Sequence, residues 1–122
     1  MTARAGCIYW VADALVKMPP ENNRTDHPRR PVLVVSGLTG NSEEAWPIVM
    51  ICPISSGPKA SAHDIRLTAG FGGLTAKSWV RVTLAQPLLK SDLTDCLSLN
   101  GIPQATLQDV HAAIFSYLEP LP

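Results

Sequence analysis

The sequence has no excess of either charge and no long apolar run. Ten basic and ten acidic side chains cancel to a net charge of zero, so no overall field draws the chain to phosphate backbones or anionic membranes. No segment approaches the roughly 18 uninterrupted apolar residues of a membrane span. The apolar stretch 7–16 is interrupted by Asp13 and no small-residue cleavage pattern follows it, which argues against a signal peptide. We therefore expect a soluble, cytoplasmic protein without a membrane partner, whose affinity for nucleic acid, if any, comes from a local patch.

Cysteine is scarce, and the motifs of metal and nucleotide sites are missing. Cys7, Cys52 and Cys96 are an odd number without Cys-x-x-Cys spacing, and we expect reduced thiols in a cytosol. Three scattered histidines form no ligand set with them. The chain has no P-loop, no Gly-x-Gly-x-x-Gly after a strand and no His-Glu-x-x-His. The sequence therefore predicts no metal and no cofactor.

The composition is that of one folded domain over residues 1–122. Hydrophobic residues make up 46% and charged residues 16% of the chain, as in ordinary globular domains. Eleven prolines limit the amount of helix. Apolar and β-branched residues gather in short segments between turn-forming residues, a pattern typical of strands. The five expected strands are 6–11, 31–36, 47–53, 62–67 and 78–84, with loops at 19–29 and 37–44.

A helical period replaces the strand pattern after Pro103. Apolar residues that share one helix face are Leu107, Val110, Ile114, Tyr117 and Leu118. Pro103 suits the first turn of a helix and Pro120 ends it. Five short strands around a small core, closed by this helix, predict a mainly β fold with α, namely a small β-barrel with a C-terminal helix. Folds of this kind serve many tasks, so function must be argued from a site.

The loop before the second expected strand concentrates charge. Positions 24–30 hold three arginines and one aspartate. Guanidinium groups bind phosphate oxygens two at a time, so such a loop can close around a phosphate. The alternative interpretation is a solvated loop with arginine–aspartate pairs.

Three segments around this loop resemble the MazF/PemK/Kid toxin family. They are Gly6-Cys-Ile-Tyr-Trp-Val-Ala-Asp13, Arg30-Pro31 at the start of Val32-Leu-Val-Val-Ser36, and Cys52-Pro-Ile-Ser-Ser56. Their order and spacing match the family, and 78–81, 89–93 and the segment before the last helix are similar to its C-terminal part. The resemblance implies an SH3-like small barrel that works as a homodimer. It also implies a sequence-specific, metal-independent endoribonuclease that cleaves single-stranded mRNA, the toxin of a type II toxin–antitoxin pair neutralised by a MazE-like antitoxin.

The resemblance also assigns the catalytic residues. Arg30 and Ser55 match the family's catalytic pair, with Ser56 as the alternative if the register slips by one. RNA supplies its own nucleophile, since the 2′-hydroxyl attacks the adjacent phosphorus once a base removes its proton, and the oxyanion then needs a cation and hydrogen-bond donors. Because a guanidinium keeps its proton in proteins and is a reluctant base, we assign Arg30 mainly to charge stabilisation. Proton transfer stays open between Ser55, Asp26 and His27.

The remaining candidates are contacts to RNA. The candidate RNA-binding residues are Arg24, Asp26, His27, Arg29, Ser56 and Lys59. Bases of single strands are recognised by stacking and edge contacts, for which the candidates, with core or dimer packing as the alternative role, are Trp46, Lys59, Phe71 and Trp79. Many family members have Glu-x-x-Gly-x-Arg-Pro where this chain reads Thr25-Asp-His-Pro-Arg-Arg-Pro31. The missing glutamate leaves Asp26 as its replacement one position later.

Two other functions compete with the nuclease. Similar small barrels of the CcdB type bind DNA gyrase through the C-terminal helix, and a family member can also bind RNA or an antitoxin without cutting. The altered loop before Arg30 favours the second of these. The presence of Arg30 and Ser55 in register favours the nuclease, because a gyrase inhibitor needs neither.

Overall fold

The computed structural model describes residues 2–19 and 28–119. Its strands and α-helices are β1 (Ile8–Ala12), β2 (Arg29–Val34), α1 (Leu38–Ser42), β3 (Ile48–Ser55), β4 (Ile65–Leu67), β5 (Ser78–Val80), β6 (Gln86–Leu89) and α2 (Gln104–Leu118). Single 3₁₀ turns occupy Asp13–Leu15, Phe71–Gly73, Val82–Leu84 and Lys90–Asp92. A mainly β fold with a C-terminal helix was the expectation, and the structure confirms it.

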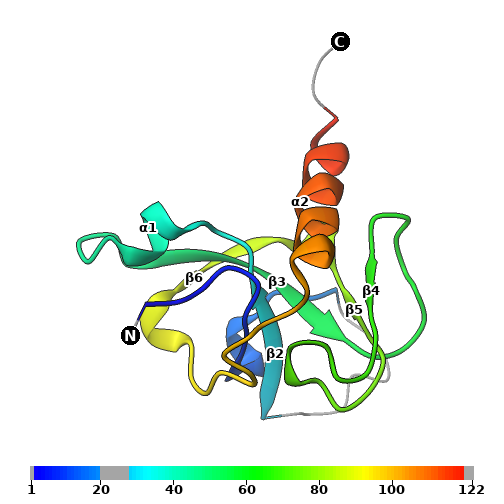
Figure 1. Cartoon of the computed structure of the whole chain (residues 1–122), viewed down its shortest axis with the longest axis horizontal. Helices are drawn as coiled ribbons and strands as arrows, with labels where there is room; N and C mark the ends of the chain where they lie inside the picture. Colours follow the sequence, from blue (N-terminus) through cyan, green and yellow to red (C-terminus); the bar gives the residue numbers. More distant parts are fainter. Residues whose placement is uncertain (1, 20–27, 120–122) are drawn as a thin grey trace.

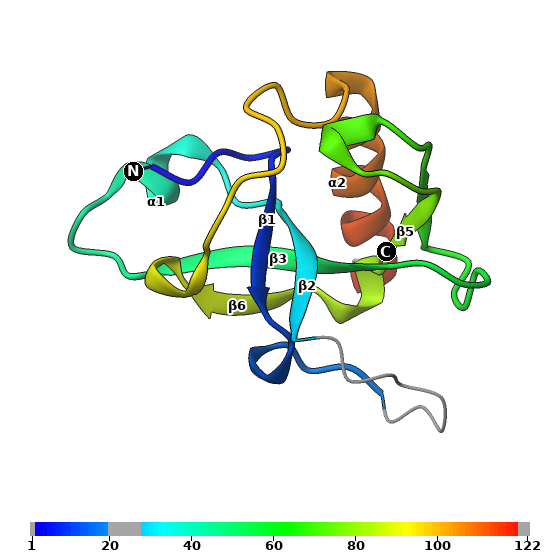
Figure 2. The same cartoon turned by 90° about the horizontal axis from the view of Figure 1, so that it is seen from below.

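The strands form one antiparallel sheet around the long strand β3. The order is β1-β2-β3-β5-β4, and β6 also pairs with β3. Residues 48–51 of β3 pair with β6, 51–53 pair with β2, and 54–55 pair with β5. Figure 2 shows β1 and β2 running steeply across β3 and β6. No ladder joins β1 to β4 among the described residues, so the barrel is open.

Two apolar clusters fill the two faces of this sheet, because successive side chains of a strand point to opposite sides. The cluster under α2 includes Ile8, Leu33, Cys52, Ile54, Val80, Leu107 and Val110. The cluster on the other face includes Tyr9, Val11, Val32, Val34, Val49 and Ile51. All three cysteines are free thiols, and burial raises the pKa of Cys52 to about 12. The expected apolar runs of β2 and β3 are therefore buried on both faces.

Helix α2 packs on the sheet as far as Ile114, and its last turn lies beyond the core. Leu107 and Val110 are buried, whereas Tyr117 is 48% exposed and Leu118 is 69% exposed. Figure 1 shows the C-terminal end of α2 directed away from the strands. The predicted apolar face is thus correct for the first turns and wrong for the last one. A helix of 15 residues rises about 22 Å and extends past the sheet.

The described residues form six strands where five were predicted. The expected strand 78–84 ends at Val80, because Arg81 turns the chain and its N–H donates to Pro53 O at 2.9 Å. A 3₁₀ turn follows, and β6 then continues along the same edge of β3. Gln86-Pro-Leu-Leu89 has little polar alternation, and the sequence pattern gave no separate signal for it.

Two further boundaries differ from the expectation. The segment 37–44 was predicted as a loop, but it contains the helical turn α1. The strand predicted at 62–67 begins only at Ile65. The carboxylate of Asp64 accepts the backbone N–H groups of Ala60 and Ser61, which folds these residues into a turn before the strand.

Candidate functional site

Arg30 is held in one orientation near the start of β2. Its Nε donates to Asp13 Oδ1 at 2.7 Å, and its Nη1 lies 3.4 Å from Ile54 O. Asp13 follows β1 directly, and Val11 pairs with Arg30 in the β1–β2 ladder, so the two strands bring the ions together. The Arg30 and Asp13 side chains are 12% and 15% exposed. The guanidinium is therefore fixed at the surface but largely removed from water.

Ser55 ends β3, and a second arginine fixes its hydroxyl. Arg81 Nε donates to Ser55 Oγ at 2.7 Å. A hydroxyl accepts and donates at once, so the proton of Ser55 is left to donate to another oxygen. The geometry thus prepares Ser55 as a hydrogen-bond donor toward an anion.

Arg81 itself is locked by a buried ion pair. Its Nη1 lies 2.7 Å from Asp64 Oδ2, and the two side chains are only 9% and 1% exposed. Burial by itself would raise the pKa of Asp64, but the N–H groups of Ala60 and Ser61 and the Arg81 guanidinium together hold this pKa below its usual value. Asp64 is therefore ionised at neutral pH, and its charge holds Arg81 against Ser55.

The register of the sheet places Arg30, Ser55 and Trp79 on neighbouring strands, in a line across the sheet that we call the row. Val32 faces Pro53 in the β2–β3 ladder, so continuing the antiparallel register by two residues sets Arg30 across from Ser55. Ser55 in turn faces Trp79 of β5. Neighbouring strands lie about 4.8 Å apart. The two residues predicted as catalytic therefore meet at one end of the sheet.

Arg81 and the role of Asp13 were missed by the sequence analysis. Asp13 was noted only as a break in the first apolar stretch and as part of the first motif, and Arg81 only as part of the expected strand 78–84 and of the segment 78–81. One signal was available, because Trp79 and Arg81 share a strand face opposite Val80 and Val82. A charged side chain so placed between buried positions requires a partner.

Two of the predicted RNA-binding residues lie beside this row. Lys59 Nζ is 5.9 Å from the centroid of the Trp79 ring. Ser56 is exposed, and its carbonyl oxygen lies 3.4 Å from Arg81 Nη2. Their contact with RNA stays a prediction.

The other predicted RNA-binding residues are not brought to this row. Arg29 faces the opposite side of β2, where its guanidinium lies 4.8 Å from the Trp10 ring centroid and 3.3 Å from Asp95. Among the aromatic candidates, Phe71 packs against the core under α2, and Trp46 is 54% exposed before β3. Residues outside the described part of the chain are Arg24, Asp26 and His27.

Comparison with known proteins places the chain in a family. The model of the PemK-like, MazF-like toxins of type II toxin–antitoxin systems matches residues 4–118. The chain belongs to this toxin family. The resemblance noted in the sequence is thereby confirmed over nearly the whole chain. No curated protein sequence matches it.

Solved structures of MazF toxins have the same fold. A MazE–MazF complex from Deinococcus radiodurans superposes with a TM-score of 0.72 at 21% identity, covering 98% of this chain and 97% of the other. An endoribonuclease in complex with its cognate antitoxin from a mycobacterial species gives 0.71 at 19% identity, covering 98% and 99%. The Mycobacterium tuberculosis toxin MazF-mt6 gives 0.70 at 17% identity, covering 93% and 96%. The MazF fold is therefore shown.

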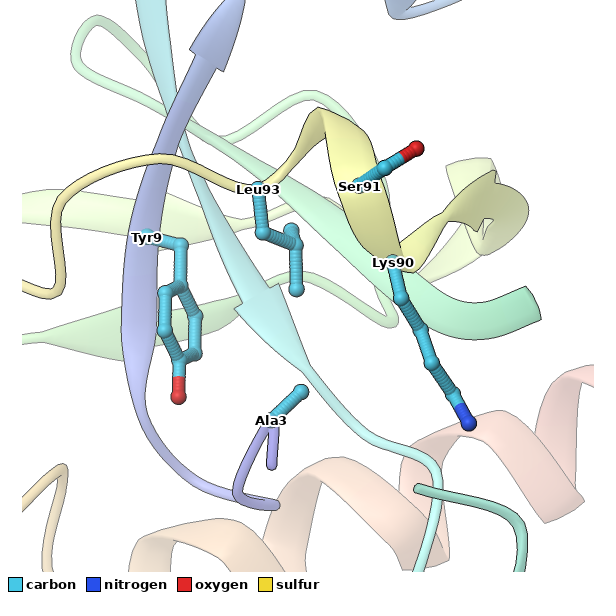
Figure 3. Close-up of a pocket in the computed structure, with 5 residues that line it drawn as sticks. All are labelled: Ala3, Tyr9, Lys90, Ser91 and Leu93. Carbon is cyan, nitrogen blue, oxygen red and sulfur yellow. The ribbon is translucent and has the colours of Figure 1, made fainter. Parts of the chain in front are cut away.

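A pocket of about 310 Å³ lies elsewhere on the toxin. Figure 3 shows its lining, which consists of Ala3, Tyr9, Lys90, Ser91 and Leu93. Two of its polar groups are already engaged, because Lys90 Nζ donates to Gly40 O and Glu43 O at 2.8 Å each and the Tyr9 hydroxyl accepts the N–H of Arg4. None of the groups in the row of Arg30 and Ser55 lines it, so this pocket is not the candidate site.

The described residues hold neither a metal-binding cluster nor a membrane-spanning helix. Within 2–19 and 28–119, no three side chains of the metal-binding types gather around one point. No helix in that part of the toxin combines the length and the apolar character needed to cross a membrane.

Proposed function

We propose that this toxin is a sequence-specific, metal-independent endoribonuclease that cleaves single-stranded mRNA, with Arg30 and Ser55 as its catalytic residues. The observation that carries the proposal is the meeting of a fixed guanidinium and a fixed hydroxyl at one end of the sheet, in a chain of the MazF-like family. An endoribonuclease is among the solved structures of the same fold.

The proposed reaction uses the 2′-hydroxyl of the RNA. Its oxygen attacks the adjacent phosphorus, the bond to the 5′-oxygen of the next nucleotide breaks, and the products carry a 2′,3′-cyclic phosphate and a 5′-hydroxyl. Arg30 stabilises the negative charge that develops on the phosphorane oxygens, and Ser55 donates a hydrogen bond to one of them. Asp13 is a positioning residue, since it holds Arg30.

The proton transfers have several candidate groups. The base that accepts the 2′-hydroxyl proton is one of Asp26, His27 and Ser55, as the sequence suggested, with Ser55 in this role only in place of its donor role. The departing 5′-oxygen takes up a proton from the protonated base or from water. Arg30 serves as the cation and takes no part in proton transfer, because a guanidinium keeps its proton in proteins.

We further propose a cytoplasmic homodimer that a MazE-like antitoxin neutralises. Solved complexes of this fold pair a toxin with its antitoxin. The supporting feature of the chain is its exposed apolar surface. Phe115 and Leu118 at the free end of α2 are 65% and 69% exposed, and Met50 and Leu89 on paired strands are 40% and 45% exposed. Residues 110–118 of α2 carry no aspartate, glutamate, lysine or arginine, which suits contact with another protein.

The test is cleavage of a long RNA in EDTA by the purified toxin, with the new ends mapped. We expect discrete cuts at a recurring motif, leaving 5′-hydroxyl ends, and loss of at least about 10³-fold in rate for Arg30→Ala, since a single oxyanion donor is worth 10²–10³. Arg4→Ala is the matched control, because Arg4 is exposed at the other end of β1, where it bonds to Leu99 O. Absence of cuts from folded, antitoxin-free toxin contradicts the nuclease and favours a non-cleaving RNA binder or a gyrase-binding inhibitor. An active Arg30→Ala variant refutes the site.

A further inference from the structure

We propose that Trp79 and the cations around it form a subsite for an unpaired nucleobase next to the scissile phosphate. This inference rests on the proposed ribonuclease function and deepens it. It assigns a base-stacking role to one aromatic side chain and a phosphate-binding role to its basic neighbours.

The register of the sheet sets Trp79 beside the catalytic row. Trp79 pairs with Ser55 on one side and with Arg66 of β4 on the other. Register partners in a sheet place their side chains on the same face. The indole therefore stands between the Ser55 hydroxyl and an exposed guanidinium, one strand spacing from the reacting phosphate.

Trp79 is held firmly without belonging to the core. Its Nε1 donates to Gly57 O at 2.9 Å, which fixes the plane of the ring. The neighbours Ser78 and Val80 are buried, whereas Trp79 keeps partial exposure and belongs to neither apolar cluster. A large aromatic ring that is fixed but not packed into a core is available to a ligand.

The cations around the indole differ from those of the catalytic row. Lys59 Nζ and Lys77 Nζ each lie 5.9 Å from the ring centroid, and Arg66 flanks it. Arg30 and Arg81 are neutralised by aspartates, but in the described residues no carboxylate lies within ion-pair distance of Lys59, Lys77 or Arg66. The toxin has no net charge, so this is a local positive patch.

An aromatic ring within uncompensated cations matches the chemistry of single-stranded RNA. Proteins bind such strands with basic grooves that follow the phosphates and aromatic rings on which the bases stack. An acidic peptide would use the cations but would not need a partly exposed, fixed ring. The observations therefore favour a nucleotide of the substrate over an antitoxin segment.

The experiment measures binding of a short RNA that spans the mapped cleavage motif, with a 2′-deoxynucleotide before the scissile bond to block cutting. Its Kd is measured by fluorescence anisotropy. We expect Trp79→Leu, which keeps apolar volume without a π face, to weaken binding roughly tenfold. Trp79→Phe should stay within about threefold of wild type because it keeps a stacking face. Tyr117→Leu, at an exposed aromatic residue on the last turn of α2, is the control and should bind as wild type does.

A second arm tests the base itself. When the nucleotide next to the scissile bond is abasic, wild type and Trp79→Leu should bind almost equally, because the stacking partner is gone. The subsite is overturned if Trp79→Leu weakens binding to abasic RNA as much as it weakens binding to the intact RNA. It is also overturned if Trp79→Leu binds the intact RNA as tightly as wild type does. Weaker binding of an acidic antitoxin peptide alone also overturns it, in favour of a protein contact.

A third arm does not depend on the tolerance of the sheet for substitution at Trp79. The double variant Lys59→Gln/Lys77→Gln removes two exposed cations, and the slope of log Kd against log salt should become shallower by about 1.4. An unchanged slope contradicts the phosphate contacts. Cleavage of the parent RNA by wild type distinguishes failure of the subsite proposal from failure of the proposed function. If wild type cleaves the RNA but the variants show none of these effects, only the subsite proposal is refuted. If wild type does not cleave the RNA, the proposed function and the subsite are both refuted.

Discussion

The two ends of β3 show how one strand serves two surfaces of opposite character. At its start, Ile48 and Met50 pair with Leu89 and Pro87 of β6 and leave apolar side chains in solvent. At its end, Ser55 lies among arginines and aspartates that bind one another. Between the two ends the strand is buried on both faces.

The difference teaches that each end meets a different physical requirement. Charged groups at the Ser55 end are costly to remove from water, so they persist there only as pairs with further hydrogen bonds. Apolar groups at the Ile48 end have no such need, and only another protein surface can cover them. The charged end therefore suits chemistry on an anion, and the apolar end suits assembly.

The largest effect should come from breaking the pair that holds the charged end. Asp64→Ala leaves Arg81 buried without its counter-ion and removes the acceptor of two backbone N–H groups. We expect a loss of about 3–5 kcal/mol in the free energy of unfolding, measured by urea denaturation. Asp95→Ala breaks the exposed pair with Arg29 and should change stability little. Equal effects of the two substitutions would show that burial does not decide the strength of these pairs.

How much of this end could be predicted depends on the residue. Arg30 and Ser55 were identified because their flanking motifs are local in sequence. Arg81 and Asp64 were not assigned, because their contact joins residues 17 apart in the sequence. Asp64 also lies in a turn before β4, where the alternating pattern had predicted a strand. The contact between Asp13 and Arg30 was also not predicted, because it depends on the register of β1 against β2. Contacts set by register follow from the folded sheet, which no local pattern specifies.

The apolar end was predicted less well. The apolar period of α2 was visible, but its last turn was expected to face the core. Tyr117 and Leu118 continue the helical period of Leu107 and Val110, and periodicity cannot show where the sheet stops beneath the helix. The strand β6 was missed for a similar reason, since a 3₁₀ turn after Arg81 separates it from β5.

The next effect concerns catalysis at the charged end. Ser55→Ala removes a donor to the phosphate oxygens but leaves Arg30 and Asp13 in place. We expect the cleavage rate on an RNA with the mapped motif to fall about 10²-fold, and the thermal midpoint to fall slightly because Arg81 Nε loses its acceptor. Ser56→Ala is the neighbouring control. A rate within threefold of wild type for Ser55→Ala, with a large loss for Ser56→Ala, would move the donor role to Ser56.

A smaller effect should appear at the apolar end. Phe115→Glu places a charge on the exposed end of α2, beyond the residues that pack on the sheet. If this surface forms the homodimer, the dimer dissociation constant should rise at least roughly tenfold, because the interface loses a large apolar side chain and gains a buried charge. Analytical ultracentrifugation over a dilution series measures it. Asp109→Asn, on an exposed position of the first half of α2, is the control, and an unchanged dimer for Phe115→Glu would place the interface elsewhere.

The smallest expected effect is a pH dependence that belongs to the charged end alone. The pKa of Asp64 is held below its usual 3.8 in the folded toxin, so below this pH the unfolded chain takes up the proton first. Protonation then favours unfolding, and the stability due to this carboxylate is present above about pH 3.8 and is lost as the pH falls through the folded pKa. Asp64→Asn removes the titrating group, and other carboxylates titrate equally in both proteins. The difference in unfolding free energy between wild type and Asp64→Asn should therefore narrow from pH 5 to pH 3, while a difference that stays constant would show that Asp64 has the same pKa folded and unfolded.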